Sequence, residues 1–174
     1  MLAYEDALTR LLNAVPSPRV ARVELDDALG LVLARPVAAR LDLPRFDNSA
    51  VDGYAVRHSR GAAPTLRCRV IGTAAAGRPF PGVVGDGEAV RIFTGAPLPR
   101  GVDAVIMQEQ VRRHDSASLC ELRSSRFEAR SAKKGGVIEA AAWPAPGQHI
   151  RRRGEDLHRG DQVLAAGTAL RPQE

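Results

Sequence analysis

The sequence is organised around residues 44–56, PRFDNSAVDGYAV. The centre of this stretch, Asp47 to Ser49, consists of short polar side chains that bond to their own backbone and favour a turn. Tyr54 to Val56 then has the residue types that begin a strand. We therefore predict a polar loop that presents Asp52 at the start of a strand, where binding and catalytic groups are common. An ordinary Asx-turn that leads into a strand explains the same residues equally well.

Short strands and turns dominate the chain on both sides of this loop. Residues 65–72 alternate in polarity, which places Leu66, Cys68 and Val70 on one face of a strand. The 16 glycines and 12 prolines recur between such segments and favour turns over helices. We predict further strands at Val20 to Leu25, Glu88 to Phe93, Ala104 to Met107, Ser118 to Leu122, Val137 to Trp143 and Asp161 to Ala165, a brief helical turn at Asp26 to Gly30 and a turn at Arg112 to Ser116. The sequence thus indicates a mostly β fold with minor helix, of the α+β class.

One amphipathic helix is predicted at the N-terminus, over Leu2 to Val15. Leu8, Leu11 and Leu12 recur there at helical spacing, and Pro16 ends the pattern. Such an apolar stripe needs a partner surface, and a β-rich chain offers no obvious one. We therefore expect the helix to pack on another domain or on a second copy of the chain in a homodimer.

Composition narrows the classes of partner. Lys and Arg number 25 against 20 Asp and Glu, a formal charge of +5 that favours an anionic ligand. Only 4% of residues are aromatic, too few and too scattered for nucleic-acid binding. Cys68 and Cys120 form no CxxC motif and no secretory signal precedes them, so we expect reduced thiols and no zinc site. No apolar run is long enough to cross a membrane, and we expect a cytoplasmic protein without a membrane partner.

Several polar residues have chemistry suited to an anion or a hard cation. Thr94 offers a hydroxyl beside Gly95, where the missing Cβ would let an oxyanion approach the backbone N–H. The Asp52 carboxylate suits Mg²⁺. The forked guanidinium groups of Arg151 to Arg153 suit phosphate, and strand alternation would send the first and third to one side. A tight turn around Thr94 and a solvated surface of Arg–carboxylate pairs are the alternatives.

Three stretches resemble, in the same order, the MoeA family of molybdopterin molybdenumtransferases, which includes the E domain of gephyrin. They are residues 44–56, 91–99 (RIFTGAPLP) and 150–156 (IRRRGED). The resemblance covers nearly the whole chain but only the front part of the family's architecture. It implies bifurcated or coiled β-sheets in two small domains. The expected parts are an N-terminal helix (residues 1–19) packing on a C-terminal domain or partner, a discontinuous β domain (20–43 plus 144–174) and an inserted β-rich domain (44–143) that carries the first stretch.

The resemblance also implies an activity, the insertion of molybdate into adenylylated molybdopterin with release of AMP and use of Mg²⁺. It implies catalytic roles for Asp52, Thr94 and Asp156, ligand-binding roles for Ser49, Gly95 and Arg151, and Mg²⁺ binding by Asp52. In that family the site lies at a dimer interface, and the pterin-binding domain would follow residue 174. We therefore expect this chain to supply one wall of the site and to be inactive alone.

Two other functions remain open. One is a binding or scaffold module, since the gephyrin E domain also serves a receptor. The other is a truncated or paralogous protein that keeps the fold without catalysis. The basic segment Ser124 to Gly136 makes the chain longer than the resemblance predicts, and we interpret it as an insertion in a surface loop.

Overall fold

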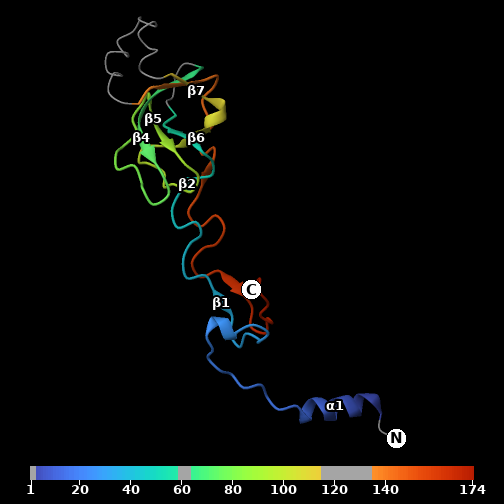
Figure 1. The fold of residues 1–174 in the computed structure, drawn as a ribbon. Helices are drawn as coiled ribbons and strands as arrows, with labels where there is room; N and C mark the ends of the chain where they lie inside the picture. The colour runs from blue at the N-terminus through green and yellow to red at the C-terminus, as the bar shows by residue number, and fades with distance from the viewer. Residues whose placement is uncertain (1–2, 59–63, 115–134) are drawn as a thin grey trace, which may run out of the picture. The chain divides into compact units, whose positions relative to one another are not determined.

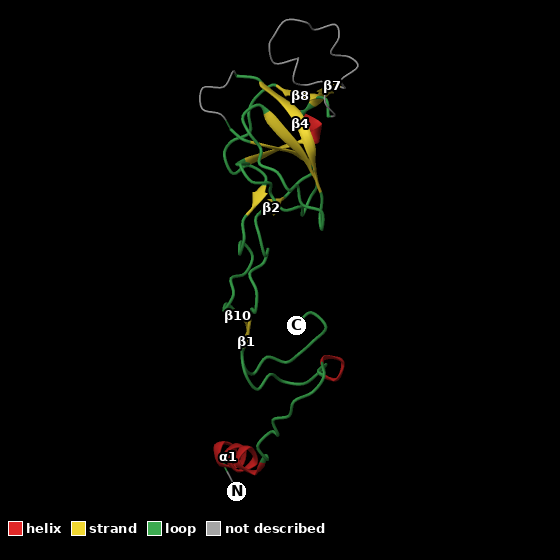
Figure 2. Ribbon diagram, turned by 90° about the vertical axis from the view of Figure 1, so that its left-hand side faces the viewer, coloured by secondary structure: helices red, strands yellow, loops and turns green. Residues whose placement is uncertain are grey.

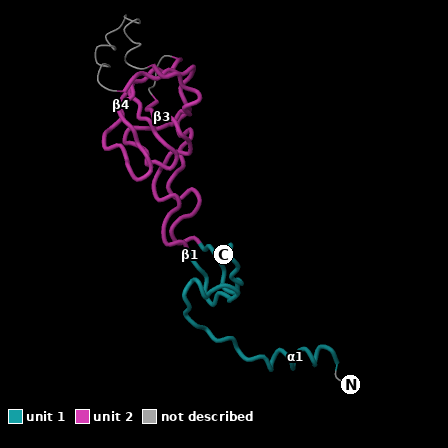
Figure 3. The backbone as a smooth tube through the Cα atoms, in the orientation of Figure 1, with its two compact units in different colours: residues 1–38, 162–174 teal, residues 39–161 magenta. Residues whose placement is uncertain are grey.

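The computed structural model describes residues 3–58, 64–114 and 135–174 (Figure 1). It divides into two compact units, coloured separately in Figure 3. Residues 1–38 and 162–174 form the terminal unit, and residues 39–161 form the central unit. The chain thus passes between units at 38/39 and 161/162, whereas the sequence led us to expect 43/44 and 143/144. The predicted strand at Ser118 to Leu122 and most of the basic segment after it lie outside the described residues.

The described residues are mostly β, which confirms the predicted fold class. The strands are β1 (Val37–Ala38), β2 (Asn48–Ser49), β3 (Gly53–Val56), β4 (Leu66–Ala74), β5 (Glu88–Ile92), β6 (Ala104–Met107), β7 (Arg112–His114), β8 (Val137–Ala140), β9 (Ile150–Arg151) and β10 (Gln162–Leu164). The helical elements are α1 (Tyr4–Ala14) and the 3-10 turns η1 (Leu25–Asp27) and η2 (Gln108–Gln110). Six of these strands form one sheet of the central unit, in the order β6-β3-β5-β4-β8-β7. Strands are drawn in yellow in Figure 2. Its strand pairs are antiparallel except β4 with β5.

Both faces of this sheet are covered at strands β3, β5 and β6, because these strands have buried apolar residues at consecutive positions. On β6, Ala104 and Ile106 join one hydrophobic cluster and Val105 joins the other. On β4, Leu66 and Cys68 are fully buried, as the alternating pattern predicts. A short apolar run buried on both faces is the pattern expected of a central strand. The sheet therefore gives a rigid base to the loops at its strand ends.

The strand that carries Asp52 into this sheet depends on Gly53. A Cβ built on Gly53 would lie 2.0 Å from the carbonyl oxygen of Ile106 on the neighbouring strand β6. Only glycine permits this close approach of the two backbones. Gly53 pairs with Ile92 on the other side, so β3 lies between β5 and β6 and the residue before it is held at the sheet end.

Three local predictions are wrong. Val20 to Leu25 forms no strand. Val20 is 76% exposed, and among the described residues no neighbouring strand pairs with this segment to stabilise an extended conformation. Arg112–His114 forms edge strand β7 rather than a turn, because it pairs with β8. Asn48–Ser49 forms strand β2 within the predicted polar turn, because pairing with β9 outweighs local turn preference.

Helix α1 is close to its predicted bounds and none of its residues is buried. Leu11 and Leu12 are 67% and 64% exposed, so the described residues leave the apolar stripe uncovered. Among the helices that the structure describes, none has both the length and the apolar character that crossing a bilayer requires.

Candidate functional site

The three stretches quoted from the sequence meet at strand β2. On one side, the Ser49 N–H donates to the Ala96 carbonyl at 3.1 Å, and the Gly95 N–H donates to the Ser49 carbonyl at 2.9 Å. On the other side, Ser49 pairs with Ile150 and Asn48 pairs with Arg151. Residues 44–56, 91–99 and 150–156 therefore form one cluster in the central unit, which their separation in the sequence does not reveal.

Asp52 and Thr94, both predicted as catalytic, are in direct contact. The backbone N–H of Thr94 donates to Asp52 Oδ1 at 2.8 Å, and its hydroxyl donates to the same oxygen at 2.7 Å. These two hydrogen bonds hold the pKa of the Asp52 carboxyl below its ordinary value, with a smaller contribution from the charge of Arg91. Among the described residues, no donor bonds to the other oxygen, Oδ2. The pair therefore presents an ionised, oriented carboxylate with one oxygen open to a ligand.

Arg91, which the sequence analysis did not single out, adjoins this pair. Its Nη1 donates to the Gly53 carbonyl at 2.8 Å, and its Nη2 donates to Gln108 Oε1. The guanidinium carbon lies 4.6 Å from the centre of the Phe93 ring and 5.2 Å from that of Tyr54. An arginine between the apolar residues Val90 and Ile92 of a strand, three residues before Thr94, was the available signal, because a charge at such a position needs specific partners.

Asp156 pairs with Arg151 and not with Asp52 or Thr94. Arg151 Nη2 donates to Asp156 Oδ1 at 2.6 Å and also to Oδ2. This carboxylate raises the pKa of the Arg151 guanidinium, first by hydrogen bonding and then by its charge. Both side chains are about half exposed, at 41% and 51%. The structure thus keeps the predicted Arg151 and Asp156 together, as an ion pair that joins the two ends of the third stretch.

The next two arginines are used for structural ion pairs. Arg152 Nη1 donates to Asp47 Oδ2 at 2.6 Å, and the Arg153 N–H donates to Asp47 Oδ1 at 2.8 Å. Arg153 Nε donates to Asp42 at 2.5 Å. Strand β9 ends at Arg151, so the alternation expected for these arginines does not extend beyond it. Arg152 and Arg153 therefore form the exposed Arg–carboxylate pairs that the sequence offered as the alternative to phosphate binding.

Ser49 and Gly95 use their polar groups within the chain. Ser49 is fully buried, and its hydroxyl donates to the Val51 carbonyl at 2.6 Å. The Gly95 N–H, expected to face an oxyanion, is bonded to Ser49 instead. Gly95 has φ +77°, a left-handed conformation that favours glycine. In this structure both residues shape the loop that holds Thr94.

A family model described as the MoeA N-terminal region (domain I and II) matches residues 2–174. The chain belongs to the MoeA N-terminal family. It is 38% identical over 173 residues to the molybdopterin molybdenumtransferase of Haemophilus influenzae, covering 99% of this chain and 38% of that protein. It is 35% identical over 180 residues to that of Synechococcus elongatus, covering 99% of this chain and 40% of that protein.

A solved structure of a MoeA protein has the same fold. The molybdopterin biosynthesis moeA protein of Pyrococcus horikoshii OT3 superposes with a TM-score of 0.78 at 34% identity, covering 99% of this chain and 42% of that one. This likeness confirms the MoeA-type fold that the three stretches predicted. The MoeA N-terminal chain spans about two fifths of the length of these relatives, at 38% and 40%.

The donor set of this MoeA N-terminal chain limits what cation it can hold. No cluster of three His, Cys, Asp or Glu side chains with metal-binding geometry exists in residues 3–58, 64–114 and 135–174. An all-protein cage, such as Ca²⁺ or zinc requires, is therefore not found there. Asp52, with Oδ1 fixed by Thr94, instead suits a cation such as Mg²⁺ that takes one carboxylate and completes its shell with water and phosphate oxygens.

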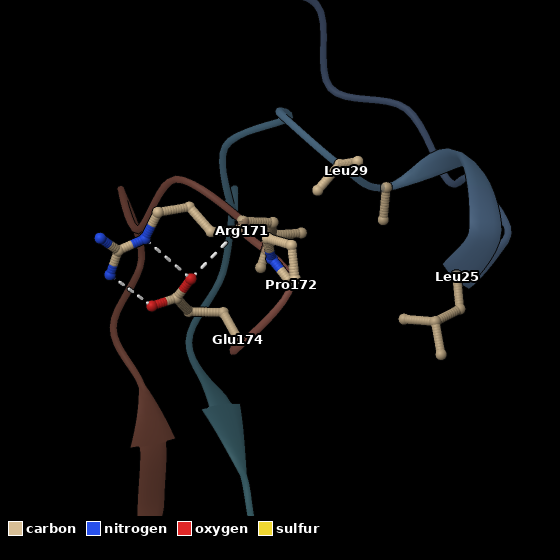
Figure 4. A pocket seen from close by; sticks show the side chains of 7 residues that line it. Leu25, Leu29, Arg171, Pro172 and Glu174 are labelled. Atoms are coloured by element: carbon tan, nitrogen blue, oxygen red, sulfur yellow. Dashed lines mark hydrogen bonds and ion pairs between the residues drawn. The ribbon is translucent and has the colours of Figure 1, made fainter.

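A separate pocket lies in the terminal unit of the MoeA N-terminal chain. Leu25, Leu29 and Pro172 form its apolar wall, and Arg171 bonds to Glu174 beside it (Figure 4). The pocket has a volume of about 390 Å³. It contains no residue of the three stretches, and its two charged groups neutralise each other. The Asp52–Thr94 pair in the central unit, where the three stretches meet, is therefore the candidate functional site.

Proposed function

We propose that this chain is the N-terminal part of a molybdopterin molybdenumtransferase and forms one wall of the site that inserts molybdate into adenylylated molybdopterin. The observation that supports this most directly is the Asp52–Thr94 contact at the meeting point of the three family stretches. The names of the relatives support the same activity for the longer protein.

The reaction needs little covalent chemistry from the protein. It exchanges ligands on molybdenum and cleaves a phosphoanhydride, so positioning and charge neutralisation are the main contributions. In this proposal Asp52 presents its open oxygen, Oδ2, toward the phosphate-bearing substrate, and Thr94 fixes the orientation of the carboxylate. Mg²⁺ held by Asp52 would neutralise phosphate charge. Arg151, on strand β9, and Asp156, in the loop after it, contribute a positioned charge pair.

The remaining parts of the site would come from outside this chain. We propose that the pterin-binding domain belongs to the part of the longer protein that this chain does not span, and that two copies of the protein build the site as a homodimer in the cytoplasm. The exposed apolar stripe of α1 supports an interface there, because stripes of that kind need cover. The isolated chain should then be inactive.

Molybdenum insertion by the full-length gene product tests the proposed activity. The purified protein is supplied with adenylylated molybdopterin, molybdate and Mg²⁺, and AMP release and pterin-bound molybdenum are measured together. Thr94→Ala should lower both rates by about 10-fold or more, because it removes one of the two donors to Asp52. Thr94→Ser keeps the hydroxyl and should retain most of the activity. Equal activity of Thr94→Ala and the parent protein would contradict the assignment.

Light scattering on the full-length protein tests the homodimer. A double substitution, Leu11→Glu with Leu12→Glu, places charge on the exposed stripe of α1 and should shift the mass toward that of a monomer. Arg10→Glu changes charge on the same helix without changing Leu11 or Leu12 and serves as the control. A parent protein that is monomeric at high concentration would remove the dimer proposal.

A further inference from the structure

Arg91 makes more contacts around the proposed site than its place in strand β5 requires. It lies opposite Tyr54 in the register of β3 and β5, and a strand position there needs only an apolar or aromatic side chain. Its guanidinium instead donates to the Gly53 carbonyl at 2.8 Å and to Gln108 Oε1, with a third, longer contact to the Ile92 carbonyl at 3.5 Å. The rings of Phe93 and Tyr54 lie within cation–π distance.

The Gly53 and Gln108 acceptors belong to segments that hold the backbone of Asp52. Gly53 is the next residue after Asp52, so a hydrogen bond to its carbonyl restrains the backbone directly beside Asp52. Gln108 begins η2, and its own N–H donates to the Asp52 carbonyl at 3.1 Å. Thr94, which holds the carboxylate, lies three residues after Arg91. Arg91 thus connects β3, β5 and η2 around one side chain.

Arginine is the residue type that suits these contacts. Its planar fork offers Nη1 and Nη2 in two fixed directions and can stack on an aromatic ring at the same time. A lysine ammonium is a compact, hydrated charge on a flexible stem and cannot reproduce that geometry. No carboxylate bonds to Arg91 among the described residues, so its charge is not used in an ion pair there.

We propose that Arg91 is a positioning residue for Asp52, acting through Gly53 and Gln108 to keep the carboxylate aligned with Thr94. The predicted effect on activity rests on the proposed function. The predicted effect on the Asp52–Thr94 hydrogen bonds does not depend on that function. Loss of Arg91 should loosen the Asp52–Thr94 contact, and displacement of a reacting group by about 1 Å lowers a rate by up to about 100-fold.

NMR on the 174-residue chain tests the geometric part without any activity. The amide signal of Thr94 reports its hydrogen bond to Asp52 through its chemical shift and its rate of hydrogen exchange. Arg91→Ala, Arg91→Lys and Arg91→Gln should each shift this signal and speed its exchange by about 10-fold. Arg67→Ala is the matched control, because Arg67 makes an exposed ion pair with Glu139 at 3.2 Å on the same sheet. Its Thr94 signal should be unchanged.

Kinetics of the full-length gene product test the functional part. Arg91→Lys should lower kcat for molybdenum insertion by about 10-fold or more and leave the KM for molybdate near that of the parent protein. An unchanged Thr94 signal in Arg91→Lys and Arg91→Gln would overturn the proposal, whether or not Arg91→Ala folds. A shifted Thr94 signal with normal kcat would also overturn it, provided that Asp52→Asn is inactive. Normal activity of Asp52→Asn would instead contradict the proposed function alone.

Discussion

Thr94 donates both its backbone N–H and its hydroxyl to a single oxygen of Asp52, at 2.8 and 2.7 Å. The two residues are 42 positions apart in the sequence, and the contact joins the start of β3 to the end of β5. Because both donors use Oδ1, the orientation of the carboxylate is fixed while Oδ2 faces no donor of the described chain. A ligand can therefore approach a carboxylate that is already oriented, which is the arrangement that electrostatic stabilisation requires.

Gly53→Ala should destabilise the central unit by about 2 kcal/mol or more. The added Cβ would lie 2.0 Å from the Ile106 carbonyl oxygen, and backbone atoms cannot move aside without separating β3 from β6. Gly85→Ala is the control, because its Cβ would come no closer than 3.4 Å to the Glu88 carboxylate. Urea unfolding measures both free energies. A Gly53→Ala protein as stable as Gly85→Ala would show that β3 and β6 do not approach as described.

Asp47→Asn should change how stability depends on acid pH. The Arg153 N–H and then the Arg152 guanidinium hold the pKa of the Asp47 carboxyl below its ordinary value. The unfolded value is about 3.9, so this stabilisation is present above that pH and is lost as the pH falls through the lower folded pKa. Asp47→Asn should therefore be less stable at neutral pH and lose less stability below about pH 4.

Unfolding curves at several pH values between 2 and 7 measure that dependence. Asp86→Asn is the control, because Asp86 faces Arg57 at 3.7 Å in an exposed pair of a kind that contributes little. Parallel pH profiles for Asp47→Asn and the parent protein would show that the contacts of Asp47 with Arg152 and Arg153 do not stabilise the fold.

Cys68 should resist thiol reagents while the protein is folded. It is fully buried on β4, and burial raises the pKa of its thiol from 9.0 to about 12. At pH 8 that shift lowers the thiolate fraction about 1,000-fold, and the reagent also lacks access. Labelling is followed in a Cys120→Ser variant, so that only one thiol remains. Rapid labelling without denaturant would contradict the burial of β4, whereas labelling that begins with unfolding is the expected result.

Local periodicity predicted the parts of the fold whose pattern is independent of distant partners. The alternation around Leu66 and Cys68 gave β4, and the continuous apolar run at 104–107 gave β6 with both faces buried. The two-residue strand at Asn48–Ser49 was not predictable, because it exists only through pairing with Ile150 and Arg151 about 100 positions later. Local polar chemistry there favours a turn, and tertiary pairing decided the outcome.

The candidate site was predictable to a similar degree. Asp52 and Thr94 each precede a glycine at a strand end, and the resemblance implies catalytic roles for them; the structure brings the two side chains together. Arg91 was missed because its acceptors, the Gly53 carbonyl and Gln108, become its neighbours only when three strands assemble. The bond of the Gly95 N–H to the Ser49 carbonyl was not predictable for the same reason, because the acceptor comes from another stretch.

The most direct test of the account is the rate of molybdenum insertion per folded molecule in Asp52→Asn of the full-length gene product. Asn has nearly the same size but lacks the charge that the proposed site uses. The account predicts a rate at least about 100-fold below that of the parent protein, with a melting temperature within about 5 °C of it. A normal rate per folded molecule, accompanied by a much lower melting temperature, would show that the Asp52–Thr94 contact serves folding and would contradict the assignment of the site.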